Sequence, residues 1–391
     1  MLNRRPKILF VACTTLEERP SMGVDQRMRI LYDGLTDIGE VDFYQADTPE
    51  SSTKQRGISI GSLRDIATKT AVLHPNLRRR RVATSTALRF REIQPEVYDV
   101  VFLHRFGACW WTVWTDPKRT ILDIDDIPSK IYYDRMRYGN PLFRVPRWFI
   151  YHWARWCEQR NLNAFRYSIV CSEEDRKYLR HDRVVVIPNA FWLPPDSDMP
   201  EYVKGNKNML FVGSLGWPPN ADGLGWFVEN VLPLIRNKIP NATITVVGRT
   251  PTRNFSRLAW RNKPGVEFIG TVNEVAPYIR DTKIEICPVL RGQGTRIKIL
   301  ESLAYAKPVV STSVGAYGID IGEREGIFRG DDPAIFADNC IRLLSDEKLR
   351  VKSGMMGRHF VLANASPEAI KRRLAVLVET ILSSQNAVSN K

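Results

Sequence analysis

The sequence lacks the long apolar runs, paired cysteines and repeats that would assign it to a membrane-spanning, disulfide-rich or repetitive class. No window of eighteen consecutive apolar residues exists, so the sequence offers no candidate for a membrane-spanning helix. Its six cysteines are scattered and none forms a C-x-x-C pair. We therefore expect neither a zinc site nor a disulfide framework. Reduced cysteines fit a cytoplasmic protein best.

Acidic residues are scarce relative to basic ones. The chain has 57 lysines and arginines against 43 aspartates and glutamates, a formal net charge of +14 at pH 7. This balance predicts an anionic partner, which could be nucleic acid, an acidic membrane surface or a phosphorylated substrate. The 391 residues suffice for two domains, and the 43% apolar and 26% charged content is typical of soluble globular proteins.

Short β-branched runs alternate with longer helical patterns along the chain. One series extends from Lys7–Cys13 to Val184–Ile187, and a second from Met209–Val212 to Ile327–Arg329. Most runs are continuously apolar, which is typical of parallel strands covered by helices on both faces. We therefore predict an α/β fold of two successive doubly wound units, with the break in the proline-rich segment 191–201.

The segment 291–313 carries the most informative pattern of the sequence. It reads R-G-Q-G-T-R-I-K-I-L-E-S-L-A-Y-A-K-P-V-V-S-T-S, which predicts a glycine loop, a helix, a turn and a strand. Gly292 and Gly294 would let the backbone approach a ligand, and Thr295 could cap the helix. The N–H groups at a helix N-terminus attract anions, most often phosphate.

Charged side chains follow the glycine loop. Arg296 and Lys298 would add positive charge at the N-terminal end of the helix. Glu301, one turn further on and at the edge of the apolar arc, could accept hydrogen bonds from a sugar diol. An ordinary capped helix with a Lys298–Glu301 surface pair is the alternative interpretation.

This segment resembles the nucleotide-sugar motif of retaining glycosyltransferases of the GT-B fold, especially glycosyltransferase family 4. The family motif has one Glu, seven intervening residues and a second Glu. Here Gln293 stands at the first position and Glu301 at the second. The resemblance implies a nucleotide-sugar donor, with UDP or GDP, whose ribose Glu301 binds. Gln293 can hydrogen-bond a sugar hydroxyl but cannot carry charge.

Neighbouring segments resemble the same family. Gly213 and Ser214 match the loop that turns under the donor diphosphate, and Gly270 ends a segment like the loop beside the nucleotide base. Many relatives have an arginine and a lysine near this first loop, where this chain has Ser214 and Trp217. Arg296, with Arg291 or Lys298 as further candidates, would then have to neutralise the diphosphate.

The resemblance implies two Rossmann-like domains that face each other across a cleft. We predict an N-terminal acceptor domain at residues 1–195 and a C-terminal donor domain at residues 196–365. The remaining residues, 366–391, would form a helix that packs back towards the first domain. In such sheets ligands bind beyond the carboxyl ends of the strands.

Candidate site residues in the first half include His104, Gly23 and Arg27. His104 ends the strand-like run Y-D-V-V-F-L-H and matches a family histidine that contacts the donor sugar, although a lone histidine is often only a core or surface residue. Gly23 matches a family glycine that lets a loop close on the donor or acceptor. Arg27 lies in the same stretch, which could equally be a simple turn before a helix.

Asp123, Asp125 and Asp126 contain a D-x-D pattern. In glycosyltransferases of the GT-A fold such a triplet binds a divalent metal, but strand-end aspartates commonly cap loops and helices. We interpret Asp125 and Asp126 as acceptor contacts or structural caps, with metal binding as the alternative. No metal and no other cofactor is expected.

Two segments bear on the partner. Arg78–Arg81 is a run of four arginines, and Arg144–Arg160 mixes arginines with Trp148, Trp153 and Trp156. Aromatic and cationic side chains together suit an anionic membrane surface. A buried aromatic core with a solvated arginine face is an equal alternative. Nucleic acid would use the same composition, but no RNA- or DNA-binding motif accompanies it, so none is expected.

These features predict a metal-independent glycosyltransferase of the hexosyltransferase type (EC 2.4). It would move a sugar with retention from a nucleotide diphosphate to a glycan or lipid-linked acceptor, in surface polysaccharide or lipopolysaccharide biosynthesis. His104, Arg296 and Gln293 are the predicted catalytic residues. We expect a cytoplasmic protein that can associate with the inner face of the membrane. A nucleotide-sugar 2-epimerase of the same fold and a non-catalytic basic protein that binds membrane or nucleic acid are the alternatives.

Overall fold

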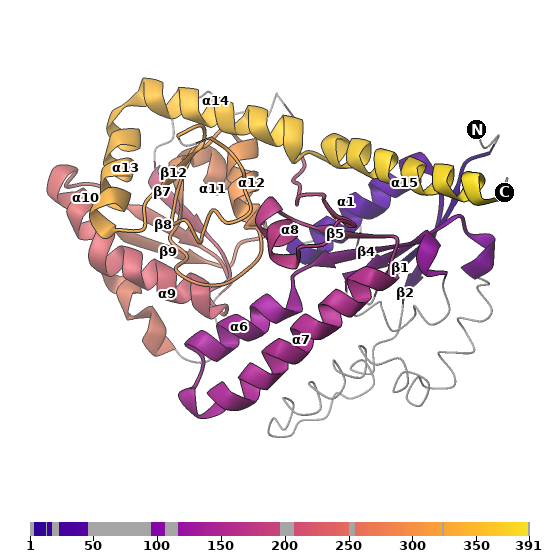
Figure 1. Ribbon diagram of the computed structural model, residues 1–391. Coiled ribbons are helices and arrows are strands. Elements are labelled where there is room, and N and C mark those ends of the chain that lie inside the picture. Colours follow the sequence, from indigo (N-terminus) through magenta and orange to yellow (C-terminus); the bar gives the residue numbers. More distant parts are fainter. Residues whose placement is uncertain are drawn as a thin grey trace. The chain divides into compact units, whose positions relative to one another are not determined.

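A computed structural model describes residues 4–12, 14–17, 23–45, 95–105, 116–195, 207–249, 255–322 and 324–389. The chain divides into two compact units (Figure 1). Unit 1 consists of Met1–Pro188 with Ile370–Lys391, and unit 2 of Asn189–Ala369. Each unit is built on its own parallel sheet, so each is described by itself.

The sheet of unit 1 has six parallel strands within the described residues, in the order β2-β1-β3-β4-β5-β6. Its strands are β1 (Lys7–Ala12), β2 (Glu40–Gln45), β3 (Val100–His104), β4 (Thr120–Asp125), β5 (Tyr167–Val170) and β6 (Val184–Val186). The strand order reverses between β1 and β3, which makes this the point where open α/β sheets bind ligands. β3 and β4 are buried along their whole length.

Within the described residues, the α-helices of unit 1 are α1 (Gly23–Ile38), α6 (Pro128–Tyr138), α7 (Arg144–Ala164), α8 (Glu173–Leu179) and most of α15 (Pro367–Ser389). The C-terminal helix α15 packs on α1, where a Cβ on Gly34 would lie 3.0 Å from the side chain of Leu374. Lys371 pairs with Asp37 at 2.8 Å. These contacts explain why the chain returns to unit 1 at its end.

Helices α6 and α7 form an antiparallel hairpin and lie side by side in Figure 1. Ile127 precedes α6 without a side-chain cap, and Glu158 of α7 instead accepts hydrogen bonds from the backbone N–H and the hydroxyl of Ser129, both at 2.6 Å. At the other end Arg147 donates to the carbonyl of Arg135 at 2.9 Å. The second helix therefore satisfies both ends of the first.

The sheet of unit 2 also has six parallel strands within the described residues, in the order β12-β11-β10-β7-β8-β9. Its strands are β7 (Lys207–Val212), β8 (Ile244–Val247), β9 (Val266–Gly270), β10 (Thr282–Cys287), β11 (Val309–Ser311) and β12 (Ile327–Arg329). Here the order reverses between β7 and β10, so the loops that follow these two strands flank the expected ligand position.

The helices of unit 2 are α9 (Pro218–Trp226), α10 (Leu232–Lys238), α11 (Ala276–Asp281), α12 (Ile297–Ala304), α13 (Pro333–Ser345) and α14 (Glu347–Asn364). A π-helical turn at Phe227–Val231 joins α9 to α10 and lets Phe227 meet Phe336 of α13 edge to face, 5.7 Å between ring centroids. Asp332 and Asp346 cap the N-termini of α13 and α14. Buried aliphatic side chains from the strands complete this core.

Two doubly wound parallel units confirm the predicted α/β architecture. Unit 2 begins at Asn189, earlier than the predicted boundary after residue 195. Phe191 and Leu193 pack against the core of unit 2, and the N–H of Phe191 donates to the carbonyl of Ala365 at 3.0 Å. The predicted boundary was too late because these apolar residues already belong to the second core.

Candidate functional site

The loops after β7 and β10 meet at the switch point of unit 2. Lys298, in the first turn of α12, donates from Nζ to the carbonyl of Val212 at 2.9 Å and to Asn220 at 3.3 Å. A Cβ on Gly213 would lie 3.3 Å from Lys298 Nζ and 2.7 Å from the Asn220 amide nitrogen. The structure therefore brings Gly213, Ser214 and Lys298 together as predicted neighbours, and it adds Asn220, which the sequence reading missed.

The loop from Gly292 to Gly294 requires glycine at both ends. The φ angle is 112° at Gly292 and 84° at Gly294, in the region that disfavours other residues. A Cβ on Gly292 would lie 3.3 Å from the Trp217 ring and 3.1 Å from the Arg296 guanidinium. At these two positions the loop therefore exposes its backbone, which is what a close-fitting anion site requires.

The side chain of Arg296 stabilises this loop through hydrogen bonds to its backbone. Its guanidinium donates to the carbonyls of Gln293 and Gly294 and lies over the ring of Trp217, 5.1 Å from the centroid. Contact between Arg296 and a diphosphate stays a prediction. The placement shows a second role that the sequence did not indicate, which is to fix the conformation of the glycine loop.

The prediction that Thr295 caps the helix is wrong. Helix α12 begins at Ile297, two residues after Thr295, and its N-cap residue Arg296 makes no side-chain capping bond. The hydroxyl oxygen of Thr295 is buried and has no hydrogen-bond partner among the described residues. The N-terminus of α12 is thus left without a side-chain cap, which keeps its N–H groups available to an anion.

Glu301 lies one turn inside α12. The side chain is half-buried, and its carboxyl group makes no hydrogen bond or ion pair within the described part of the chain. Burial raises the pKa of this carboxyl group to about 7. Glu285 of β10 is a second buried acid beside it, which accepts a hydrogen bond from Ser302. Burial raises the pKa of Glu285 well above its usual range, and the Glu301 charge adds to this while Lys298 opposes it.

Sequence reasoning missed Glu285, although one signal could have found it. Glu285 stands between two isoleucines in T-K-I-E-I-C, and burying a charged group in a strand is costly unless it has a function. The two carboxyl groups differ in surroundings: Glu285 is fully buried, whereas Glu301 keeps some access. Glu301 is therefore the acid that a ligand can reach.

The carboxyl ends of β7, β8 and β9 also run close together. The N–H of Gly248 donates to the carbonyl of Gly270 at 2.8 Å. A Cβ on Gly248 would lie 1.9 Å from the carbonyl oxygen of Gly213, so only glycine fits between the two loops. Gly270 itself has a φ of 85°. The predicted site glycines Gly213 and Gly270 thus lie on one edge of the sheet, joined through Gly248.

The strand-end edge of unit 1 is built from buried charges. Arg27 donates to Asp123 through Nε at 3.1 Å and through Nη2 at 2.5 Å, and through Nη1 to the carbonyl of Ile187 at 3.1 Å. His104 Nδ1 lies 2.9 Å from Asp123 Oδ2. All three side chains are fully buried or nearly so. Arg27 is placed inside α1, which begins at Gly23, so the predicted loop there is already helix.

The pKa values of this cluster follow from the ion pair. Burial disfavours the charge of Arg27, but the Asp123 carboxylate outweighs it and raises the pKa of Arg27 above its ordinary value. Burial likewise opposes ionisation of Asp123, yet the Arg27 charge and the His104 contact hold the pKa of Asp123 well below its usual range. Asp123 is therefore ionised at any physiological pH.

Asp125 and Asp126 pair with Arg105. The Arg105 guanidinium lies 2.9 Å from Asp125 and 3.5 Å from Asp126. Both Arg105 and Asp125 adopt positive φ angles, 68° and 55°, which non-glycine residues rarely do. Among the described residues no group of three or more His, Cys, Asp or Glu side chains could hold a metal ion. The carboxylates of the D-x-D pattern, Asp123 and Asp125, thus form ion pairs with guanidinium groups.

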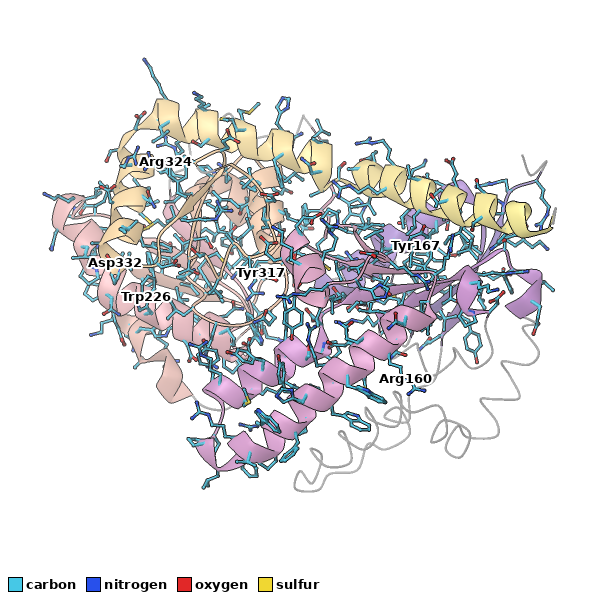
Figure 2. All side chains as sticks on the ribbon, in the orientation of Figure 1. Arg160, Tyr167, Trp226, Tyr317, Arg324 and Asp332 are labelled. Carbon is cyan, nitrogen blue, oxygen red and sulfur yellow. The ribbon has the colours of Figure 1, made fainter. Side chains whose placement is uncertain are left out.

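The aromatic side chains of α7 point outward. Trp148 is 48% exposed and Phe149 63% exposed, and Trp153 and Trp156 are exposed as well. Arg160, labelled in Figure 2, projects from α7 with its guanidinium 5.4 Å from the centroid of Trp156. The alternative that these rings fill the domain core is wrong, because they are exposed and the buried residues of α7 are others, such as Ala154, Cys157 and Asn161.

The other predicted contact with a membrane, Arg78–Arg81, lies outside the described residues. Over the part of the chain that the structure describes, no helix combines the length and the apolar character needed to cross a bilayer.

Comparisons with known proteins bear on both units. Residues 206–346 match the family described as "Glycosyl transferases group 1". A protein from the cps region of Klebsiella pneumoniae, described as an uncharacterized 44.6 kDa protein, is 26% identical over 196 residues, which cover 46% of this chain and 50% of that protein. The chain spans about half the length of the curated relatives it matches.

Solved structures resemble the whole chain. Sucrose-phosphate synthase from Thermosynechococcus elongatus is 15% identical with a TM-score of 0.69, over 97% of this chain and 100% of that one. Anabaena HepE, crystallised with UDP and glucose, is 14% identical with a TM-score of 0.61, over 96% and 100% of the chains. At such identities the likeness shows the fold, and it confirms the predicted GT-B class. The comparisons thus give a glycosyltransferase family match over residues 206–346 and the GT-B fold over nearly the whole chain.

Proposed function

We propose that the protein transfers a sugar, with retention of configuration, from a nucleotide diphosphate donor to a glycan or lipid-linked acceptor. The observation that carries this is the edge of unit 2, where an uncapped helix N-terminus follows a glycine loop and an unpartnered Glu301 lies one turn further on. A diphosphate fits the first element and a ribose diol the second. Of UDP and GDP, UDP is favoured by the likeness to HepE, which binds it.

For this reaction, the site must stabilise the nucleotide diphosphate as it leaves. As the glycosidic bond to the nucleotide breaks, charge grows on the phosphate oxygens, and preorganised donors aimed at it lower the barrier. The α12 N-terminus and the Gly292–Gly294 backbone supply such donors without reorganisation. Arg296, which fixes the loop, and Lys298, which lies beneath Gly213, add positive charge nearby. Gln293 would hydrogen-bond the transferred sugar rather than carry charge towards it.

Turnover is proposed to need no divalent metal. Asp123 already accepts hydrogen bonds from Arg27 and contacts His104, and Asp125 and Asp126 pair with Arg105. EDTA should therefore leave the rate unchanged. Loss of turnover with EDTA and its recovery with Mn²⁺ would instead identify Asp123 and Asp125 as metal ligands.

An anionic membrane is the proposed surface on which the acceptor is met. The hairpin surface is defined here as the exposed apolar residues of α7 and of the turn that joins it to α6, which are Leu142, Phe143, Val145, Trp148, Phe149, Trp153 and Trp156. The two helices carry six arginines and one lysine against one aspartate and one buried glutamate. Rings at headgroup depth with guanidinium groups on lipid phosphates suit such an interface. This would hold the enzyme at the inner face of the cell membrane, in surface polysaccharide or lipopolysaccharide assembly.

A panel of UDP-, GDP- and ADP-sugars tests the activity. Thermal-shift measurements should show one nucleotide diphosphate stabilising the protein, and turnover with that sugar should release the nucleotide diphosphate only when a glycan or lipid-linked acceptor is present. Conversion of the nucleotide sugar to its 2-epimer without acceptor would point to an epimerase. Absence of any shift across the panel would contradict the proposal and leave a non-catalytic protein.

A further inference from the structure

The glycine loop and the first turn of α12 carry three cations, and each of them contacts one residue in the first half of α9 or at its N-cap. One contact places a guanidinium group over an indole ring, the second is a hydrogen bond from an ammonium group to an amide oxygen, and the third is an ion pair. All six residues belong to unit 2. The pairs are Arg296 with Trp217, Lys298 with Asn220, and Arg291 with Asp222.

Two of these pairs hold a cation without neutralising it. Arg296 is 8% exposed, and its guanidinium carbon lies 5.1 Å from the centroid of the Trp217 ring. Lys298 donates at 3.3 Å to the buried Asn220, and its Nζ lies 4.3 Å from the centroid of the Phe211 ring. A ring face and an amide oxygen attract a cation but carry no net charge. These contacts therefore fix both side chains and leave their positive charge in place.

The acids near these cations differ in burial. Glu285 lies close enough to Lys298 for the ammonium charge to lower the pKa of its carboxyl group, but burial outweighs this and raises that pKa well above its usual range. The uncharged form of Glu285 is therefore favoured, and it does not balance Lys298. Asp222 pairs with Arg291 where the two side chains are 38% and 32% exposed, so water screens this pair. The two inner cations are thus left to attract an anion.

We propose that Trp217 and Asn220 are positioning residues of the diphosphate site, which hold Arg296 and Lys298 through uncharged contacts so that both cations keep their charge for the diphosphate. The identity of the anion rests on the proposed function, whereas the uncharged mode of holding does not. Charge that is fixed before the reaction stabilises the leaving group without a reorganisation cost. By the same reasoning, Asp222 weakens the attraction slightly, because it brings a negative charge to the rim of the site.

Substitutions of Asn220 separate this role from a purely structural one. Asn220→Asp keeps an oxygen for Lys298 but adds a negative charge, whereas Asn220→Ala removes the contact and adds no charge. Both variants lose the hydrogen bond from Nδ2 to the carbonyl of Ser214, so this loss cancels between them. The measured quantity is the affinity for UDP divided by the affinity for uridine, called here the phosphate ratio, because a general loss of structure lowers both affinities.

We expect the phosphate ratio to fall about tenfold in Asn220→Asp and by less in Asn220→Ala, since the aspartate neutralises the cation that it holds. Calorimetry gives the affinity for UDP and NMR titration the weaker affinity for uridine. If Asn220 served only as a structural contact, the aspartate would be the milder change of the two. A fall in Asn220→Ala that equals or exceeds the fall in Asn220→Asp would overturn the proposal.

The ring of Trp217 is tested by a pair of apolar variants. Trp217→Phe and Trp217→Leu both keep an apolar side chain beside the glycine loop, but only phenylalanine keeps an aromatic face for Arg296. The phosphate ratio should fall about tenfold in Trp217→Leu and no more than about threefold in Trp217→Phe. Equal falls would show that the ring serves only as bulk and would overturn its positioning role.

Asp222→Asn should act in the opposite direction. It keeps an oxygen for Arg291 and removes the negative charge at the rim. The phosphate ratio should therefore rise about twofold at low salt and by less at high salt, because exposed charges are screened. A ratio that falls at low salt would contradict the charge argument.

Inorganic pyrophosphate distinguishes failure of this inference from failure of the proposed function. If no nucleotide of the panel binds but the affinity for pyrophosphate falls more in Asn220→Asp than in Asn220→Ala, the proposed function fails and the positioning role stands. If UDP binds and the two variants follow the reverse order, the function stands and the positioning role fails. Binding of neither UDP nor pyrophosphate would overturn both.

Discussion

The two units end their central strands in opposite ways, although both are doubly wound sheets with a switch point. In unit 1 the edge is closed by charged side chains that satisfy one another, Arg27 with Asp123 and Arg105 with Asp125. In unit 2 the edge is lined by glycines, with an uncapped helix and an unpartnered Glu301. In the described part of unit 1 the edge leaves the buried Nε2 of His104 without a hydrogen-bond partner, whereas the edge of unit 2 offers backbone donors from a glycine loop and a helix N-terminus.

This difference predicts where mutations act. Removing a member of a buried, mutually satisfied cluster leaves a charge without its partner and costs stability. Removing a group that has no partner in the free protein costs little stability, and its loss is felt only when a ligand binds. Unit 1 should therefore report on folding, and unit 2 on donor affinity.

The largest effect should come from Asp123→Ala. It strands the buried Arg27 charge, which should lower the free energy of unfolding by about 3–5 kcal/mol. Asp33→Ala is the matched control, because Asp33 pairs with Arg29 at 2.9 Å on the surface of α1. That exposed pair should contribute only about 0.3–0.5 kcal/mol. Urea denaturation of both variants measures the contrast, and equal losses would show that the unit 1 cluster is no more than a surface network.

Gly292→Ala should act on binding rather than folding. The added Cβ would contact Trp217 and Arg296 at a φ that alanine disfavours, so the loop must shift, and about 1–3 kcal/mol of affinity for the nucleotide diphosphate should be lost. Gly216→Ala is the control within the same site. A Cβ there would meet only the Ser214 hydroxyl at 3.6 Å, an ordinary contact. Calorimetry showing equal affinities for the two variants would contradict a role for the glycine loop.

The glycine loop was foreseeable because its signal is local: residues close in sequence form one loop and one helix turn. The unit 1 cluster was not, since Arg27 and Asp123 lie 96 positions apart and only the parallel topology joins them. His104 was singled out by resemblance, but its partner Asp123 belonged to a D-x-D pattern that was interpreted as an acceptor contact or structural cap, with metal binding as the alternative. The position of Thr295 was misjudged because the helix start shifted by two residues, which a propensity pattern does not resolve.

In unit 2, Glu301→Gln should lower donor affinity without lowering stability. Loss of charged hydrogen bonds to the ribose should cost about 1.5–3 kcal/mol of donor affinity. Burial raises the pKa of Glu301 from 4.5 to about 7, so ionisation of this group opposes folding as pH rises from 4.5 towards 7. Removing the charge should therefore not lower the stability of the protein. Glu229→Gln, at an exposed position of unit 2, is the control. A clear drop in melting temperature for Glu301→Gln would assign Glu301 a structural role instead.

The same pKa gives donor binding a pH dependence. Diol hydroxyls donate more strongly to the carboxylate than to its protonated form, so affinity should be full above pH 7 and fall as pH drops below it, by no more than the contribution of charged hydrogen bonds, about 1.5–3 kcal/mol. The Glu301→Gln variant should lose this dependence. Calorimetry from pH 8 to pH 6 tests both, and a flat wild-type profile would mean that Glu301 does not meet the donor.

The smallest effect per residue should be on membrane binding, because it depends on surface residues. The two units also differ in how their exposed apolar side chains are distributed. Exposed large apolar side chains gather on the hairpin surface of unit 1, including Leu142 at 83% exposure, whereas those described in unit 2, such as Leu234 and Ile335, lie on separate helices. Each basic residue near an anionic bilayer contributes about 1 kcal/mol, screened over a Debye length of roughly 10 Å at 0.1 M salt. Arg144→Ser with Arg147→Ser should thus weaken binding to anionic vesicles by about 2 kcal/mol, and added salt should weaken it in the wild type.

Leu142 and Phe149 separate this interface from simple charge attraction. Replacing both with serine should reduce vesicle binding that persists at high salt, because their contribution is burial of apolar area, which salt does not screen. Leu234→Ser with Ile335→Ser in unit 2 is the matched control and should bind as the wild type does. Co-sedimentation with anionic and neutral vesicles measures all four proteins. Equal pelleting with both lipids, insensitive to salt and to every substitution, would show that the hairpin surface does not meet the bilayer.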